Sequence, residues 1–400
     1  MKPANPHLTL SNGHLAIIVF AQFAGTSLWF AGNAVLPDLQ RMLNVPALNG
    51  WITSAVQLGF VLGTLLYALF AIPDRFPTTH VFLVSVALAA LVNVAWLVGP
   101  LRAEFVLGSR FLTGFFLAGV YPVGMKIAAD WFRPVLGRAM GFLVGALVVG
   151  TAFPHWLRGL GTLLPYPLIT GAVSGLALLG GLLLLATIPS KPVGLTANVT
   201  PNNAPGIHSL RALAQPSAFR PAMLGYFGHM WELYTVWAFL PMLVNLYATR
   251  HPDQLINASL WSFGTIAAGA VGCVLGGYVA LRLGSERVAR GLLITSGLCV
   301  LLVPFLLDLP PLSFALFLFI WGLAAAGDSP QFSTLVASLT PLDQRGSLIT
   351  LVVSIGFLLT VLSIQLMAWL VAQVGPSVWL FWLLLPGPLL GTWAIWRKRQ

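Results

Sequence analysis

Apolar stretches of membrane-spanning length follow one another along this chain of 400 residues. Each stretch is bounded by Pro, Gly, Asn or a charged residue. A bilayer core about 30 Å thick is crossed by about 20 apolar residues in a helix. The sequence therefore predicts an all-α membrane protein with twelve transmembrane helices. They are expected near residues 15–37, 51–72, 80–100, 104–127, 137–158, 163–187, 220–247, 258–281, 288–307, 312–338, 347–373 and 376–396.

Composition excludes a soluble domain. Hydrophobic residues make up 58% of the chain and charged residues 8%, whereas about 25% of an ordinary soluble domain is charged. The net charge is +10, but the Lys and Arg residues are scattered in ones and twos between the apolar segments. A nucleic-acid surface gathers such charges into a patch or stripe. We therefore expect a lipid bilayer and no nucleic acid as a partner.

The Lys and Arg residues also predict the orientation. With the N-terminus inside, fourteen of them fall on the cytoplasmic side and four outside, while Arg110 and Lys126 fall within the fourth segment. Loops rich in Lys and Arg stay in the cytoplasm. We expect a multi-pass protein of the cytoplasmic (inner) membrane, with both termini cytoplasmic.

One stretch cannot be a spanning helix. Residues 189–219 hold five Pro among polar and basic residues, a composition typical of a linker. Six segments precede it and six follow it. The sequence thus predicts an N-terminal bundle (1–188), a cytoplasmic linker (189–219) and a C-terminal bundle (220–400).

The two halves repeat a pattern. Arg75 lies 63 residues before Arg138, and Arg282 lies 63 residues before Arg345. The fourth and tenth segments are interrupted at Gly119-Val120-Tyr121-Pro122 and at Gly327-Asp328-Ser329-Pro330. Repeated halves with interrupted helices at matching positions are typical of secondary transporters, which bind their substrate between the halves. We predict two pseudo-symmetric six-helix bundles.

These motifs resemble the major facilitator superfamily over essentially the whole chain. The loop Pro73-Asp74-Arg75-Phe76, its counterpart with Arg282 and Gly284, and Arg110 four residues before Gly114 carry the resemblance. It implies the major facilitator fold and gating roles for Asp74, Arg75 and Arg282. The alternative is that these charges only set the topology. Segments 119–132 and 229–241 look similar to poorly characterised bacterial members near the cyanate- and nitrate-type permeases.

Ionisable residues inside apolar segments need a partner, a water-filled cavity or a function, because they are costly in a bilayer. Glu232 has His229 one helical turn away, and we predict that this pair exchanges protons. Asp328 is a second proton-coupling candidate. The alternatives are a buried hydrogen bond between helices for Glu232 and a helix cap at Pro330 for Asp328.

Arg110 is the candidate for binding an anionic substrate, because a guanidinium holds carboxylates with two hydrogen bonds. Alternatively it is a permanent counter-ion for Glu232 or Asp328. Polar and aromatic residues of the apolar segments complete the predicted substrate site, although most Trp residues are expected at the membrane interfaces. These further candidates are Trp29, Asn33, Gln57, Tyr121, Trp231, Tyr234 and Gln331.

The resulting prediction is a monomeric secondary transporter that moves a small organic or inorganic anion by proton-coupled symport. Proton-driven efflux of drugs or amphipathic metabolites is the alternative. A passive channel or a membrane enzyme is the alternative of another class, but the sequence holds no phosphate loop, nucleophile elbow or two-His metal motif. We expect no cofactor and no metal.

Overall fold

Helices run through every described part of the chain, and no strand occurs in those parts. The structure is a computed structural model, and it describes residues 11–45, 48–100, 102–132, 136–161, 164–189, 219–339 and 345–397. Ten helical stretches within them are long and apolar enough to cross a membrane. Large apolar side chains such as Val84, Leu91 and Leu316 are exposed on the outer faces of these helices. Such a surface suits lipid rather than water.

Every predicted segment corresponds to helices in the structure. The N-terminal ones are α1 (Asn12–Thr26), α2 (Ala31–Ala34), α3 (Leu36–Leu43), α4 (Leu48–Leu69), α5 (Ile72–Arg75), α6 (Thr78–Val98), α7 (Ala103–Leu117), α8 (Tyr121–Trp131), α9 (Leu136–Gly159) and α10 (Tyr166–Thr187). The C-terminal ones are α12 (Arg220–Arg250), α13 (Ala258–Leu283), α14 (Ser285–Leu302), η3 (Val303–Phe305), α15 (Pro311–Gly327), α16 (Ser329–Leu339), α17 (Arg345–Val374), η4 (Val378–Leu384) and α18 (Pro386–Arg397).

The predicted interruptions of the fourth and tenth segments are present. α7 ends at Leu117 and α8 begins at Tyr121, with Pro122 in its first turn. α15 ends at Gly327 and α16 begins at Ser329, followed by Pro330. Proline is well placed in a first helical turn because its missing N–H is not needed there. The two halves thus carry the same break at the same place.

The prediction of one continuous first helix, residues 15–37, is wrong. α1 ends at Thr26, a turn follows, and the chain continues as α2 and α3. The hydroxyl of Ser27 donates to the carbonyl oxygen of Ala24 at 2.7 Å, which helps to end α1. The break contains neither Gly nor Pro within residues 26–30, so the usual sequence marks of a helix end are missing there.

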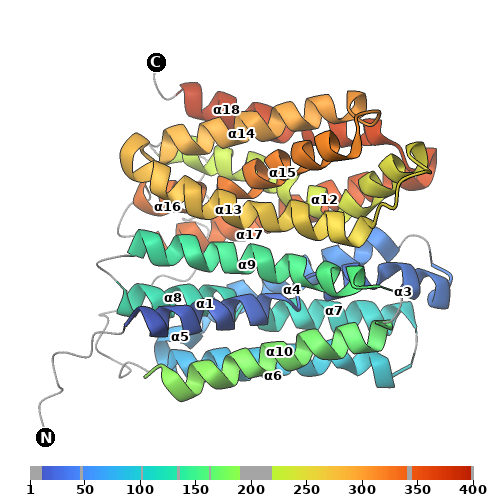
Figure 1. Cartoon of the computed structure of the whole chain (residues 1–400). Helices are drawn as coiled ribbons and strands as arrows, with labels where there is room; N and C mark the ends of the chain where they lie inside the picture. The colour runs from blue at the N-terminus through green and yellow to red at the C-terminus, as the bar shows by residue number, and fades with distance from the viewer. Residues whose placement is uncertain are drawn as a thin grey trace, which may run out of the picture.

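The helices form two groups (Figure 1). α1–α10 lie in the lower half of the view and α12–α18 in the upper half, with α9 next to α13 and α4 next to α17 where the groups meet. We call this contact the seam. α1 begins at the end of the molecule where α5 lies, and α3 lies at the opposite end. The linker prediction falls almost entirely outside the described residues, so the domain boundaries stay a prediction.

Close helix contacts are also repeated in the two groups. In the first, a Cβ atom at Gly114 of α7 would overlap the carbonyl oxygen of Val56 in α4. In the second, a Cβ atom at Gly322 of α15 would overlap the carbonyl oxygen of Thr265 in α13. Small residues let transmembrane helices approach this closely. Each interrupted helix is therefore fixed against its neighbour through a glycine.

Candidate functional site

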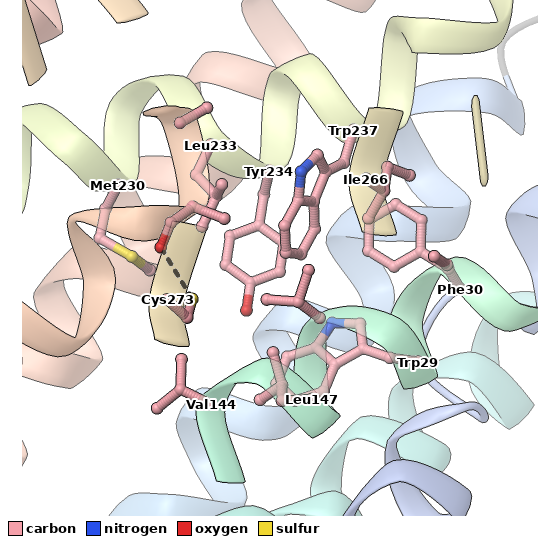
Figure 2. Packing of buried hydrophobic residues seen from close by; sticks show 14 of the residues in the cluster. Trp29, Phe30, Val144, Leu147, Met230, Leu233, Tyr234, Trp237, Ile266 and Cys273 are labelled. Atoms are coloured by element: carbon pink, nitrogen blue, oxygen red, sulfur yellow. Dashed lines mark hydrogen bonds between the residues drawn. The ribbon is translucent and has the colours of Figure 1, made fainter. Parts of the chain in front are cut away.

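Six buried aromatic side chains meet at the seam, and we call them the aromatic cluster. The Trp29 ring stacks on Tyr234 with 6.0 Å between centroids, and the Phe30 ring meets Trp237 edge-on at 6.1 Å. Figure 2 shows these four side chains facing one another. The predicted site residues Trp29 and Tyr234 are thus in contact, from different halves. The full cluster is Trp29, Phe30, Phe60, Tyr234, Trp237 and Phe357.

Arg110 holds the turn that carries Trp29 and Phe30. Its guanidinium donates to the carbonyl oxygens of Leu28 at 2.9 Å and Trp29 at 2.5 Å, and to Oδ1 of Asn93 at 2.6 Å. The broken helix leaves these carbonyls without intrahelical partners, and Arg110 supplies the donors. The predicted counter-ion role is therefore not seen, because the partners of the guanidinium are Asn93 and backbone carbonyls rather than Glu232 or Asp328.

Several polar atoms buried near the seam have no hydrogen-bond partner among the described residues. The side-chain amide oxygen and nitrogen of Gln57 are unpaired, and so are the indole nitrogens of Trp29 and Trp237. Buried polar groups are nearly always hydrogen-bonded. These unpaired groups come from both halves of the chain, and a bound polar solute or water can satisfy them.

The predicted proton-coupling residues lie inside the C-terminal group of helices. Nδ1 of His229 is 2.8 Å from Oδ1 of Asp328, and its Nε2 is 2.7 Å from the hydroxyl of Ser329. Glu232 accepts hydrogen bonds from the hydroxyl of Ser296 and, at 3.1 Å, from the indole of Trp321. The side chains of His229, Glu232 and Asp328 are all buried. We call these three residues the acid cluster.

The sequence predicted His229 as the partner of Glu232, and the structure corrects this. Residues three apart on a helix differ by about 60° in direction. That difference turns Glu232 towards α14 and α15, while His229 meets the junction of α15 and α16. Asp328 is thus the direct partner of His229.

The remaining predicted substrate residues are divided between the seam and other places. Asn33 donates to the hydroxyl of Thr53 at 2.6 Å and lines a cleft between the helix groups. Tyr121 begins α8 and is half-buried. Gln331 is buried in the first turns of α16. Trp231 lies away from the seam, because its indole donates to the carbonyl oxygen of Leu383 within the C-terminal group at 3.0 Å.

The predicted gating loops lie at the α5 end of the molecule. Asp74 of α5 forms an ion pair of 2.8 Å with Lys126 of α8, which joins this loop to the second part of the interrupted fourth segment. Arg75 and Arg282 are exposed. Their gating role stays a prediction.

A cleft of about 390 Å³, lined in part by α3, opens between the two helix groups. One wall comes from α2, α3 and α9, and the other comes from α12, α13 and Pro376. Most of its surface is apolar. Among the described residues no three His, Cys, Asp or Glu side chains are grouped as a metal site would require.

Sequence reasoning missed several residues that complete these sites. Phe30, Phe60 and Phe357 were not distinguishable from other apolar residues of the spanning helices. Asn93 and Ser296, which bind Arg110 and Glu232, lie on distant segments. Ser329 belongs to the interrupted motif of the tenth segment. Its position next to Asp328 in the sequence could have indicated it as a further site residue.

Comparisons with known proteins point to one family. The sequence profile described as Major Facilitator Superfamily matches residues 15–364. In structure, the chain is similar to a mutant of the nucleoside transporter NupG, with a TM-score of 0.73 and 15% identity over 97% of this chain and 99% of that one. It is also similar to the human organic anion transporter MFSD10 (TETRAN), with a TM-score of 0.70 and 17% identity over 95% and 99%.

One curated relative matches in sequence over a shorter stretch. The niacin transporter NiaP of Acinetobacter baylyi is 30% identical over 121 residues, which are 28% of this chain and 27% of that protein. The match therefore spans about a quarter of the relative.

Proposed function

The chain belongs to the Major Facilitator Superfamily and is a multi-pass membrane transporter, and from this premise we propose that it moves a small organic anion together with protons. The profile covers most of the chain, and both structural neighbours are transporters. Transport rather than catalysis is therefore its activity. The substrate, the coupling ion and the orientation below are our proposals.

The acid cluster is the observation that carries proton coupling. An ionised side chain inside a membrane protein is costly unless it is paired, and the described partners of Glu232 are a hydroxyl and an indole rather than a cation. His229 contacts Asp328 directly, and an imidazole ring can both accept and donate a proton. We propose that Glu232, assisted by His229 and Asp328, binds and releases the transported proton.

The seam supports alternating access. The aromatic cluster joins side chains of α12 and α17 to side chains of α4 and the turn after α1. Rocking of residues 1–188 against residues 220–400 would separate these rings and expose the unpaired polar groups of Gln57, Trp29 and Trp237. We propose that residues 189–219 form the linker, and that the α5 end and both termini face the cytoplasm of a cell with this protein in its inner membrane.

The substrate class follows from three supports. Arg158 lines the cleft between the helix groups, the seam is aromatic, and the partial relative is a niacin transporter. Niacin is a flat aromatic ring with one carboxylate, so it combines both features. We propose small aromatic monocarboxylates as substrates and nicotinate as the first compound to test.

Uptake by proteoliposomes tests the proposal. Labelled nicotinate should accumulate when the vesicle interior is made alkaline, and protein-free vesicles give the background. Glu232→Gln should abolish accumulation but keep exchange of nicotinate across the membrane at equal pH. Glu104→Gln is the matched control, because Glu104 is exposed near the start of α7. Unchanged accumulation by Glu232→Gln would contradict the role of this residue.

Efflux of amphipathic compounds is the second candidate, and the aromatic cluster favours it. Aromatic walls accept many flat apolar solutes. A strain that lacks the protein would then become sensitive to such compounds. Normal resistance together with loss of nicotinate uptake would exclude efflux as the main activity.

A further inference from the structure

The cleft at the α3 end has the size of a ligand site. Its volume is about 390 Å³, and small-molecule sites in proteins measure about 300–1,000 Å³. Its walls come from both helix groups, so any movement of the groups changes its width. A solute that enters the seam from this end passes through the cleft.

The cleft carries positive charge that the protein does not fully neutralise. Arg158 of α9 lines it, with its side chain 25% exposed, and lies 2.8 Å from Oδ2 of Asp38. The other oxygen of Asp38 is bound by Arg41 at 2.5 Å. Two guanidinium groups thus share one carboxylate. None of the described residues that line the cleft is acidic, so the group of Arg41, Arg158 and Asp38 leaves one net positive charge beside the cleft.

A second polar group faces the same space. His155 lies almost one turn before Arg158 on α9 and also lines the cleft. This residue is 2% exposed, and its Nε2 atom has no hydrogen-bond partner among the described residues. A buried polar atom without a partner is costly unless a ligand or water binds it. His155 and Arg158 can therefore contact one carboxylate together.

The opposite wall suits the rest of an organic acid. Pro241, Met242 and Leu246 of α12 give it an apolar surface, and Asn245 and Thr249 add hydrogen-bonding groups. A flat ring can pack on the apolar residues while its carboxylate reaches α9. Contacts to both walls would fix the ligand across the cleft.

We propose that this cleft is an outer binding site for small organic monocarboxylates, in which Arg158 binds the carboxylate and His155 donates a second hydrogen bond. The site is distinct from the aromatic cluster and from Arg110. The inference rests on the proposed anion transport and adds the place where the anion binds before it reaches the seam. Charge-assisted hydrogen bonds of this kind are stronger than neutral ones.

Equilibrium binding of nicotinate to the purified full chain tests this site, with nicotinamide as the neutral analogue. Binding can be followed by the rise in melting temperature with ligand concentration. Arg158→Gln should weaken nicotinate binding about tenfold or more, since a charged group loses its partner. Arg102→Gln is the matched control, because Arg102 is exposed and does not line the cleft. Asn245→Leu tests the opposite wall and should weaken binding without any change at α9.

The outcomes separate the inference from the proposed function. Equal nicotinate affinity in Arg158→Gln, Asn245→Leu and the unmodified protein would overturn the outer site while leaving anion transport intact. Absence of nicotinate binding to the unmodified protein would overturn both. Arg158→Gln leaves Asp38 paired with Arg41, so its fold should persist, and an unchanged melting temperature without ligand would confirm this. A preference for nicotinate over nicotinamide that disappears in Arg158→Gln is the expected result.

Discussion

His229 and Asp328 are joined inside the C-terminal helices, with 2.8 Å between Nδ1 and Oδ1. His229 belongs to the long helix α12, and Asp328 lies where α15 gives way to α16. The pair therefore fixes the interruption of the tenth segment to a helix that also carries Tyr234 and Trp237 of the aromatic cluster. A change of protonation at this pair can act on the seam through α12.

A double-mutant cycle measures this pair. His229→Ala and Asp328→Ala each leave the partner side chain buried and unpaired, and each should lower the stability by at least about 1–3 kcal/mol. The double variant should be more stable than the sum of the single effects predicts, with a coupling energy of about 0.5–3 kcal/mol. Unfolding in increasing fractions of SDS gives these values. Strictly additive effects would show that the two side chains do not depend on each other.

Arg110 should be essential for the turn after α1. Its replacement by Gln removes the donors to the carbonyl oxygens of Leu28 and Trp29, and hydrogen bonds to charged groups contribute about 1.5–3 kcal/mol each. We expect Arg110→Gln to lower the melting temperature and to change the fluorescence of Trp29. Arg110→Lys should restore little of the lost stability, because a single ammonium group replaces the planar guanidinium with its several N–H donors. Normal stability of both variants would contradict this role.

The glycine contact between α4 and α7 gives a second stability test. Gly114→Ala should destabilise the protein by about 1–3 kcal/mol, because the added methyl group meets the backbone of Val56. Gly108 is the control in the same helix, since nothing lies within 4 Å of a Cβ atom there. Gly108→Ala should leave the melting temperature equal or higher. A similar loss of stability in both variants would contradict the special role of the contact between Gly114 and Val56.

Alternating access predicts that a link across the seam stops transport. Nε2 of Gln365 in α17 donates to the hydroxyl of Ser54 in α4 at 2.9 Å. Ser54→Cys combined with Gln365→Cys should lose nicotinate exchange after treatment with a short bifunctional thiol reagent that a reductant can cleave. Reduction should restore it, and the single variants should be unaffected. The native Cys273 and Cys299 are buried. Full exchange by the linked protein would contradict movement at this seam.

The extent of sequence-based prediction differs between the fold and the site. Apolar length places the spanning segments, and Pro122 and Pro330 mark the breaks of the fourth and tenth ones, because these features act within one helix. The break at residues 27–30 depends on Arg110, which lies about 80 positions away in the chain. Asp328 is likewise distant from His229. Such contacts form only when helices pack against one another. Helical periodicity describes neighbours within one helix, so it could indicate only Glu232 as the partner of His229.

The most direct test of the account is whether nicotinate transport moves protons through Glu232. In weakly buffered proteoliposomes, addition of nicotinate should make the external medium more alkaline as protons enter with the anion, and Glu232→Gln should give no pH change while it still exchanges nicotinate. Nicotinate uptake without any proton movement in the unmodified protein would contradict proton coupling.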